Sequence, residues 1–281
     1  MSGLRFAFNT NGCAHHRLDD ALALIAEAGY AGVALTLDHH HLDPFAPALD
    51  RRADALARRL AALGLGAVIE TGARYLLDPR RKHEPTLISP EPEGRARRLD
   101  FLTRALDVAA ATGAEAVSLW SGVRAPDLDP ALARRWLAEG LAELVARAQA
   151  REVVVALEPE PGHLIQTGAD YAALTAAVPG LTLALDVGHL LVTGEAEPAE
   201  AILAWRHQLG TVAIEDMKRG VHEHRAFGEG DLDLPAALAA LHAIEFDRLV
   251  CVELSRDSHR AHEIIPASIA QLRAAEAAIF M

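Results

Sequence analysis

The chain repeats one hydrophobic pattern from end to end: a short apolar run, a polar loop, then a longer stretch rich in Ala, Leu and Arg. The short runs contain many β-branched residues and predict buried strands, whereas the longer stretches have the length and spacing of helices. The predicted strands span residues 4–9, 32–37, 66–70, 115–120, 153–158, 181–186, 211–216 and 248–254. The predicted helices span residues 18–29, 48–63, 93–112, 130–150, 169–177, 198–207, 235–243 and 259–277.

This alternation of strands and helices predicts an α/β fold with a parallel sheet. Eight such units within 281 residues favour a closed (β/α)8 TIM barrel. A doubly wound sheet is the rival, but no Gly-x-Gly-x-x-Gly turn follows the first predicted strand. We therefore expect one TIM-barrel domain that covers residues 1–281.

Composition narrows the possible partners and the cellular compartment. Apolar residues make up 51% of the chain and aromatic residues only 5%, which suits a core of small aliphatic side chains. The formal net charge of −12 disfavours nucleic acid and anionic membranes as partners, so an anionic substrate would need a local basic pocket. Two distant cysteines, no cleavage-like signal and no membrane-length apolar stretch together predict a cytoplasmic protein.

Two predicted loops are longer than the fold requires. They cover residues 71–92 and 217–234, and each follows a predicted strand. Long ordered loops in a compact domain are usually functional. Both would lie at the C-terminal rim of a barrel, where TIM-barrel enzymes hold their active sites.

Acidic residues end five of the eight predicted strands. Any one of them could be a helix cap or a solvated loop residue, but strand ends in a barrel converge on one axis. Carboxylates crowded there repel each other, and a divalent cation is the simplest relief. The residues are Glu70, Glu158, Asp186, Glu215, Asp216 and Glu253.

Histidines gather in the same places. His189 follows strand six, and His222 and His224 form a His-x-His pair in the loop after strand seven. Alternate residues of an extended segment point the same way, so this pair is spaced to bind a metal. The triplet 39–41 follows strand two, and at most one or two of its rings, such as that of His40, can face the axis.

Four segments carry a family resemblance that covers nearly the whole chain. They are ALEPEPG around Glu158, LALDVGH ending at His189, the HEHRAFGEGDLD loop, and VCVEL near Glu253. With them the chain resembles the xylose isomerase-like TIM barrels, the superfamily of sugar (and sugar phosphate) isomerases and epimerases, keto-inositol dehydratases and endonuclease IV.

The resemblance implies that Glu158, Asp186 and Glu253 bind a divalent metal ion (Mn, Co, Zn or Mg) and that His189 touches metal or substrate. The His222 and His224 loop is similar to the endonuclease IV stretch that holds an extra zinc through Asp-x-His.

One position departs from the family pattern. The family usually has a metal-binding histidine three residues before the aspartate that ends strand seven, and that position here is Ala213. Alanine cannot bind a metal, so Glu215, His222 or His224 would have to replace the missing ligand.

The expected reaction is sugar isomerisation or epimerisation, in which a proton leaves a carbon beside a carbonyl and returns elsewhere or to the opposite face. Glu158 and Glu253 are the expected acid/base pair, with a metal stabilising the enediolate between them. A basic run in the third loop, Arg74 and residues 80–83, could bind a phosphate or carboxylate, or could simply be solvated. The expected substrate-binding residues are His189, Trp120, Glu70, Arg74 and His40.

The sequence leaves three alternative functions open. A metal-assisted dehydratase of a keto-sugar or keto-inositol needs the same base and metal. An endonuclease is disfavoured by the net charge of −12. A non-catalytic metabolite-binding barrel is disfavoured because binding alone does not require two opposed carboxylates. The expected partner is a small polyhydroxy molecule, and a homo-oligomer is possible.

Overall fold

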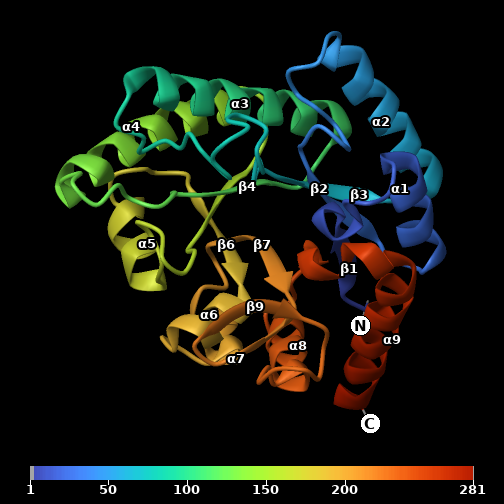
Figure 1. The fold of residues 1–281 in the computed structure, drawn as a ribbon. Helices are drawn as coiled ribbons and strands as arrows, with labels where there is room; N and C mark the ends of the chain where they lie inside the picture. Colours follow the sequence, from blue (N-terminus) through green and yellow to red (C-terminus); the bar gives the residue numbers. More distant parts are fainter. Residues whose placement is uncertain (1–2, 281) are drawn as a thin grey trace.

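The computed structural model describes residues 3–280 and contains a closed barrel of eight parallel strands (Figure 1). The barrel order is β1-β10-β7-β6-β5-β4-β3-β2, so neighbours in sequence are neighbours in the barrel apart from a small hairpin after β7. The eight strands are β1 (Arg5–Asn9), β2 (Gly32–Thr36), β3 (Gly66–Glu70), β4 (Val117–Trp120), β5 (Val155–Glu158), β6 (Thr182–Asp186), β7 (Leu209–Ile214) and β10 (Leu249–Val252). The predicted TIM barrel is confirmed.

The helices surround the barrel in chain order, with α3 and α4 on one side and α9 closing the ring beside α1 (Figure 1). Proline in the first turn, which lacks the N–H that a helix start leaves unpaired, opens α3, α4, α7 and α8. The helices are α1 (Leu18–Glu27), α2 (Leu49–Leu63), α3 (Pro92–Thr112), α4 (Pro130–Gln149), α5 (Gly168–Thr175), α6 (Val187–Thr193), α7 (Pro198–Ala204), α8 (Leu234–Ala243) and α9 (Ala261–Ile279). Two 3-10 helices, η1 (Thr10–Cys13) and η2 (Ser255–Arg260), follow β1 and β10.

The chain after β7 differs from the prediction. β7 ends at Ile214, two residues earlier than expected, so Glu215 and Asp216 lie beyond the barrel strand. Asp216 instead opens β8 (Asp216–Lys218), which pairs antiparallel with β9 (Val221–Arg225). The expected loop 217–234 therefore contains part of a two-stranded hairpin that is hydrogen-bonded separately from the barrel.

Small side chains fill the barrel interior. One buried cluster contains Ala7, Ala34, Val68, Leu249 and Cys251, and another contains Ala116, Ala156 and Ala184. Because these side chains are short, they leave a cavity of about 30 Å³ below the strand ends, close to the size of one water molecule. Within residues 3–280, no helix combines the length and apolar character needed to cross a bilayer.

Candidate active site

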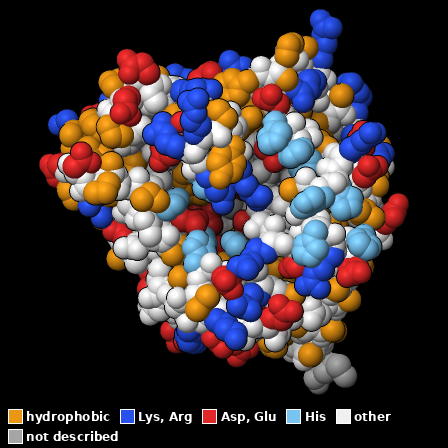
Figure 2. Space-filling view, in the orientation of Figure 1, with side chains coloured by type: hydrophobic (Ala, Val, Ile, Leu, Met, Phe, Trp, Pro, Cys, Tyr) orange, Lys and Arg blue, Asp and Glu red, His pale blue; other side chains and the backbone are white. Residues whose placement is uncertain are grey.

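A polar cavity of about 440 Å³ opens at the C-terminal ends of the barrel strands. Figure 2 shows it as a hollow near the centre of this face, with acidic atoms deep inside and Lys and Arg side chains on two sides. Four of its lining residues are glutamates that belong to, or closely follow, three barrel strands: Glu70, Glu158, Glu160 and Glu253. Of the six acids predicted at strand ends, Glu70, Glu158 and Glu253 thus line one cavity.

Glu158 and Glu253 reach the cavity from β5 and from the residue after β10, which are separated in the barrel by β6 and β7. Burial, reinforced by the charge of Glu160, raises the pKa of Glu158 well above its ordinary value. Burial and the charge of Asp186 raise the pKa of Glu253 to about 7. Asn11 steadies Glu253 by donating a hydrogen bond of 2.8 Å from Nδ2 to Oε1.

Asp186, Glu215 and His224 form a first group of possible metal ligands, whose ligand atoms all lie within 4.8 Å of one another. Glu215 is 0% exposed, and neither of its oxygens has a hydrogen-bond partner in the described chain. Asp186 Oδ2 and His224 Nδ1 are buried and equally unpartnered there. Unsatisfied buried carboxylates are costly, so this group has the chemistry of a cation site.

The ring of His189 is oriented so that the lone pair of Nε2 faces the cavity. Its Nδ1 lies 3.1 Å from the carbonyl oxygen of Pro159, which can only accept, so Nδ1 carries the proton in the neutral ring. Nε2 then faces His222 Nε2 at 3.1 Å and Asp186 Oδ2 at 3.6 Å. Burial lowers the pKa of His189 to about 4, so the ring is neutral at pH 7 and able to bind a metal.

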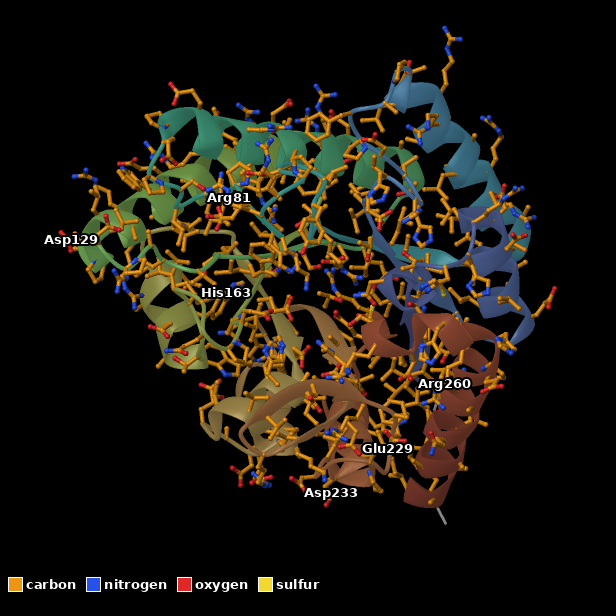
Figure 3. All side chains as sticks on the ribbon, viewed as in Figure 1. Arg81, Asp129, His163, Glu229, Asp233 and Arg260 are labelled. Carbon is orange, nitrogen blue, oxygen red and sulfur yellow. The ribbon has the colours of Figure 1, made fainter. Side chains whose placement is uncertain are left out.

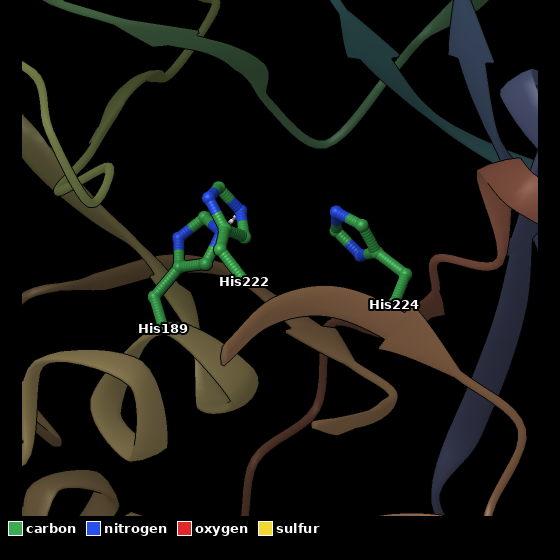
Figure 4. A group of neighbouring side chains, drawn as sticks. All are labelled: His189, His222 and His224. Carbon is green, nitrogen blue, oxygen red and sulfur yellow. Dashed lines mark hydrogen bonds between the residues drawn. The ribbon is translucent and has the colours of Figure 1, made fainter. Parts of the chain in front are cut away.

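The hairpin supplies the other two imidazoles. His222 and His224 both lie on β9. Together with His189 they form a second group of possible metal ligands, whose ligand atoms all lie within 4.8 Å of one another. Figure 4 shows the rings of His189 and His222 side by side, with that of His224 across a gap from them. Burial lowers the pKa of both hairpin histidines, so they too favour the neutral form.

Glu160 is a cavity residue that the sequence analysis did not single out. It lies two residues beyond β5, with Oε1 3.5 Å from His222 Nε2 and Oε2 3.9 Å from His189 Nε2. With Glu158 and His189 it forms a further group of possible metal ligands. The repeated acid in the segment EPEPG was its available signal.

Trp120, named above as a substrate-binding residue, lines the cavity and packs against a buried arginine. The guanidinium carbon of the fully buried Arg98 lies 4.6 Å from the centre of the indole ring, and Arg98 Nη2 donates to Thr71 O at 2.8 Å. His83 and His163 pack edge-on against the indole, with centroids 5.2 and 5.0 Å away. Figure 3 shows His163 close to α5.

Glu70 and Arg74, which the sequence analysis named as substrate-binding residues, both line the cavity. Glu70 Oε1 accepts the backbone N–H of Gly72 at 2.5 Å, which turns the chain sharply at the end of β3. Burial and the charge of Glu253 raise the pKa of Glu70.

The structure does not bring His40 to this cavity. His40 is exposed and lines a separate hollow with His15, His16 and Arg17. The reason lies in Asp38, whose Oδ1 accepts the backbone N–H groups of both His40 and His41 at 2.9 Å. This turn leaves His39 and His40 exposed, whereas His41 is buried. Asp216 has a similar structural role, because its carboxylate accepts N–H groups of Gly228 and Leu232 and anchors the loop after the hairpin.

Ala213 lies inside the barrel beside Asp186, its partner in the β6–β7 register. It lines the 30 Å³ cavity together with Asp186, Glu158 and Glu253. A ligand at position 213 would therefore point at the acidic cluster from below. Glu215 and His224 approach the same cluster from the hairpin side instead.

Glu253 differs from the other expected metal ligands. It lines the cavity but belongs to none of the three groups of close ligand atoms found in residues 3–280. Its carboxylate is bonded to Asn11 instead.

The chain shares its fold with several solved structures. L-ribulose 3-epimerase matches with a TM-score of 0.79 and 20% identity over 99% of this chain and 96% of the other. The 3-keto-D-glucoside 4-epimerase YcjR from E. coli matches with 0.76 and 20% over 96% and 99%. The IOLI protein with a bound zinc atom matches with 0.75 and 18% over 98% of each.

No curated protein sequence matches the chain significantly. The family model described as xylose isomerase-like TIM barrel matches residues 22–275, which is most of the chain. The chain therefore belongs to the xylose isomerase-like TIM barrel family.

Proposed function

We propose that this protein is a divalent-metal-dependent isomerase or epimerase of a polyhydroxy ketone, such as a ketose or a keto-cyclitol. The observation that carries the proposal is the pair Glu158 and Glu253, two buried carboxylates that face one polar cavity from well-separated strands. A substrate between them has one proton-transfer group on each side. Binding alone would not need that arrangement.

The raised pKa values suit proton transfer at neutral pH. A pKa of about 7 for Glu253 lets its carboxylate act as a base and its acid form act as a donor near pH 7. Burial also raises the pKa of Glu158 well above its ordinary value, which favours the protonated form until a base is needed. One glutamate would remove the proton beside the carbonyl, and the other would return a proton from the opposite side.

The residues present fit a divalent ion. Asp186, Glu215 and His224 offer four buried polar atoms without partners in the described chain, and these three residues would hold the ion. Bound there, Mn, Co, Zn or Mg would stabilise the negative charge that develops on the substrate oxygens. His189, with its Nε2 lone pair held in place by Pro159, would bind either the ion or a substrate hydroxyl.

Other cavity walls suit a sugar. Trp120 gives a rigid flat face for the apolar side of a sugar ring, while Asn11 and the glutamates offer hydrogen-bonding groups. Two of the similar structures, L-ribulose 3-epimerase and 3-keto-D-glucoside 4-epimerase, belong to the same reaction class and support the proposal. The net charge of −12 disfavours a nucleic acid substrate.

A metal-assisted dehydratase of a keto-sugar is the second candidate, because it begins with the same proton abstraction. The discriminating experiment incubates the protein and Mn²⁺ with a panel of ketoses and keto-cyclitols in heavy water. An isomerase or epimerase yields products of unchanged mass apart from carbon-bound deuterium, whereas a dehydratase yields products lighter by one water. Absence of both outcomes across the panel, with metal bound, would refute the proposed reaction class.

A further inference from the structure

The connection between β3 and α3 brings two cations, Arg74 and Lys82, to the cavity wall. They lie in a cavity that five glutamates also line, in a chain of net charge −12. Arg74 is half-buried, yet its guanidinium makes no ion pair or hydrogen bond with any residue between 3 and 280. Lys82 likewise has no ion-pair partner in that part of the chain.

Other cations around the cavity are neutralised. Arg256, on the opposite rim, lies 3.0 Å from Glu223. Arg81, in the same connection as Arg74, lies 2.8 Å from Asp78 and is not part of the cavity lining. Arg74 and Lys82 are therefore the arginine and lysine of the cavity lining that have no salt-bridge partner within residues 3–280. The positive charge of Arg74 opposes the rise in pKa of Glu70 and Glu253 but forms an ion pair with neither.

The two charges are close enough to repel each other. Burial and the positive charge of Arg74 lower the pKa of Lys82. Holding two cations together costs free energy unless an anion offsets it. The weak attraction of Lys82 to Glu160 opposes this shift without abolishing it.

Residues next to both cations have an unusual backbone conformation. Ala73 and Tyr75, on either side of Arg74, both have φ of 53°, and His83, next to Lys82, has φ of 71°. Left-handed backbone at non-glycine residues is strained and persists only where surrounding contacts impose it. The ring of His83 supplies one such contact, because its Nδ1–H donates to Gly72 O at 2.6 Å and ties the two ends of the segment together.

We propose that Arg74 and Lys82 bind an anionic group, a phosphate monoester or a carboxylate, at the end of the substrate remote from the reacting carbon. The inference rests on the proposed function for the rest of the ligand and extends it by naming a charged substrate class. A guanidinium matches two oxygens of such a group at once, and an ammonium adds a point charge. The cavity volume of about 440 Å³ accommodates a small sugar with such a substituent.

The first test measures binding of inorganic phosphate and of acetate to the metal-loaded protein by calorimetry. The double variant Arg74→Gln/Lys82→Gln should weaken binding by about tenfold or more, because it removes charge-assisted hydrogen bonds. The matched control is Arg80→Gln/Arg81→Gln, which removes the same charge from the same connection but from residues that do not line the cavity. The variant Arg74→Lys/Lys82→Arg, which keeps both charges, should recover part of the affinity.

The outcomes separate the alternatives. Phosphate bound more tightly than acetate identifies a phosphate ester as the substituent, and the reverse order identifies a carboxylate. Equal loss of affinity in both double variants, or loss in neither, would overturn the proposal, because the anion would then respond to general charge or bind the metal.

A second test compares deuterium wash-in from phosphorylated, carboxylated and neutral ketoses. A preference of about tenfold for an anionic ketose, abolished by Arg74→Gln/Lys82→Gln, is the expected result. A preference for neutral ketoses that the double variant does not change would overturn the anion site. Anion binding that depends on Arg74 and Lys82, without wash-in from any ketose, would instead refute the proposed reaction and leave the anion site standing.

Discussion

Glu215 occupies the space that a side chain at position 188 would need: a Cβ on Gly188 would overlap Glu215 Oε1. Gly188 lies in the first turn of α6, two residues after Asp186 and directly before His189. The absence of a side chain there lets the carboxylate from the end of β7 reach the cluster of possible metal ligands. Glycine at this position is thus part of the candidate metal site.

Gly188→Ala should therefore displace Glu215 and weaken metal binding. Displacing a carboxylate from such a site should reduce metal affinity by about 10- to 100-fold. Calorimetric titration of chelator-treated protein with Zn²⁺ or Mn²⁺ measures the change. Gly140→Ala on α4 is the control, because its added Cβ meets only the flexible Leu87 side chain. Gly188→Ala in a Glu215→Ala background should cost almost nothing further; a full additional loss would place its effect elsewhere.

Ala213→His tests the position where the family usually has a histidine. The imidazole would enter the 30 Å³ cavity beside Asp186, which is too small for it. Overpacking should lower the stability of the metal-free protein by about 1–3 kcal/mol, measured by urea unfolding. Metal affinity or selectivity should also change, because a new nitrogen would face the acidic cluster. Ala213→Leu, with similar bulk and no donor atom, should show the destabilisation only; identical metal titrations for the two variants would place position 213 outside the site.

The buried glutamates should make the metal-free protein less stable as pH rises. The folded-state pKa of Glu253, about 7, is above its ordinary value of 4.5, so the folded state retains a proton that the unfolded state loses. Stability contributed by this group is fully present below pH 4.5 and falls as pH rises to about 7, by up to about 3 kcal/mol. Urea unfolding with chelator present, at pH 5 and pH 7.5, measures the loss.

Glu253→Gln should flatten that pH dependence, because a neutral amide has no proton to lose. Burial raises the pKa of Glu158 and Glu215 in the same direction, so part of the slope should persist in this variant. A divalent ion should restore stability at pH 7.5. A wild-type protein that becomes more stable between pH 5 and pH 7.5 without metal would contradict the burial argument.

Glu158→Gln and Glu253→Gln should each lower turnover by about 10²- to 10⁴-fold, the usual contribution of a positioned acid or base. In an epimerase with one base on each side, each variant should retain deuterium wash-in from only one epimer. Kinetics on both epimers in heavy water measure this asymmetry. Glu139→Gln, on the exposed surface of α4, serves as the control. Full turnover in both cavity variants would shift the search for the base to His189, His222 and His224.

The barrel and the acidic strand ends could be predicted because each depends on local pattern. Glu158 and Asp186 follow apolar strands, and barrel geometry then brings them together. Glu160 could not be distinguished from an ordinary loop acid, since its approach to His222 depends on how the hairpin folds over the mouth. The bounds of β7 were wrong by two residues at each end because the apolar run from Leu209 to Ile214 continues directly into two acids that look like its end.

Runs of identical or similar residues in the sequence gave the least information about which side chain reaches the site. Three consecutive histidines, 39 to 41, contain no signal for which ring faces inward, and the answer depends on the turn that Asp38 stabilises. The same limit applied to the third loop, where the paired Arg81 and the unmatched Arg74 are alike in sequence. Only the position of Asp78 in the folded loop distinguishes them.

The hairpin of β8 and β9 is a structural unit separate from the sheet of the barrel. Within residues 3–280 its strands pair with each other and with no barrel strand, so the hairpin contributes none of the hydrogen bonds between the barrel strands. The barrel supplies the carboxylates of Glu158 and Asp186, and the hairpin supplies the imidazoles of His222 and His224. Preference among divalent ions follows the balance of nitrogen and oxygen ligands. Replacing this hairpin with another sequence would therefore change the preference of the site among divalent ions, while the barrel strands and their carboxylates stay unchanged.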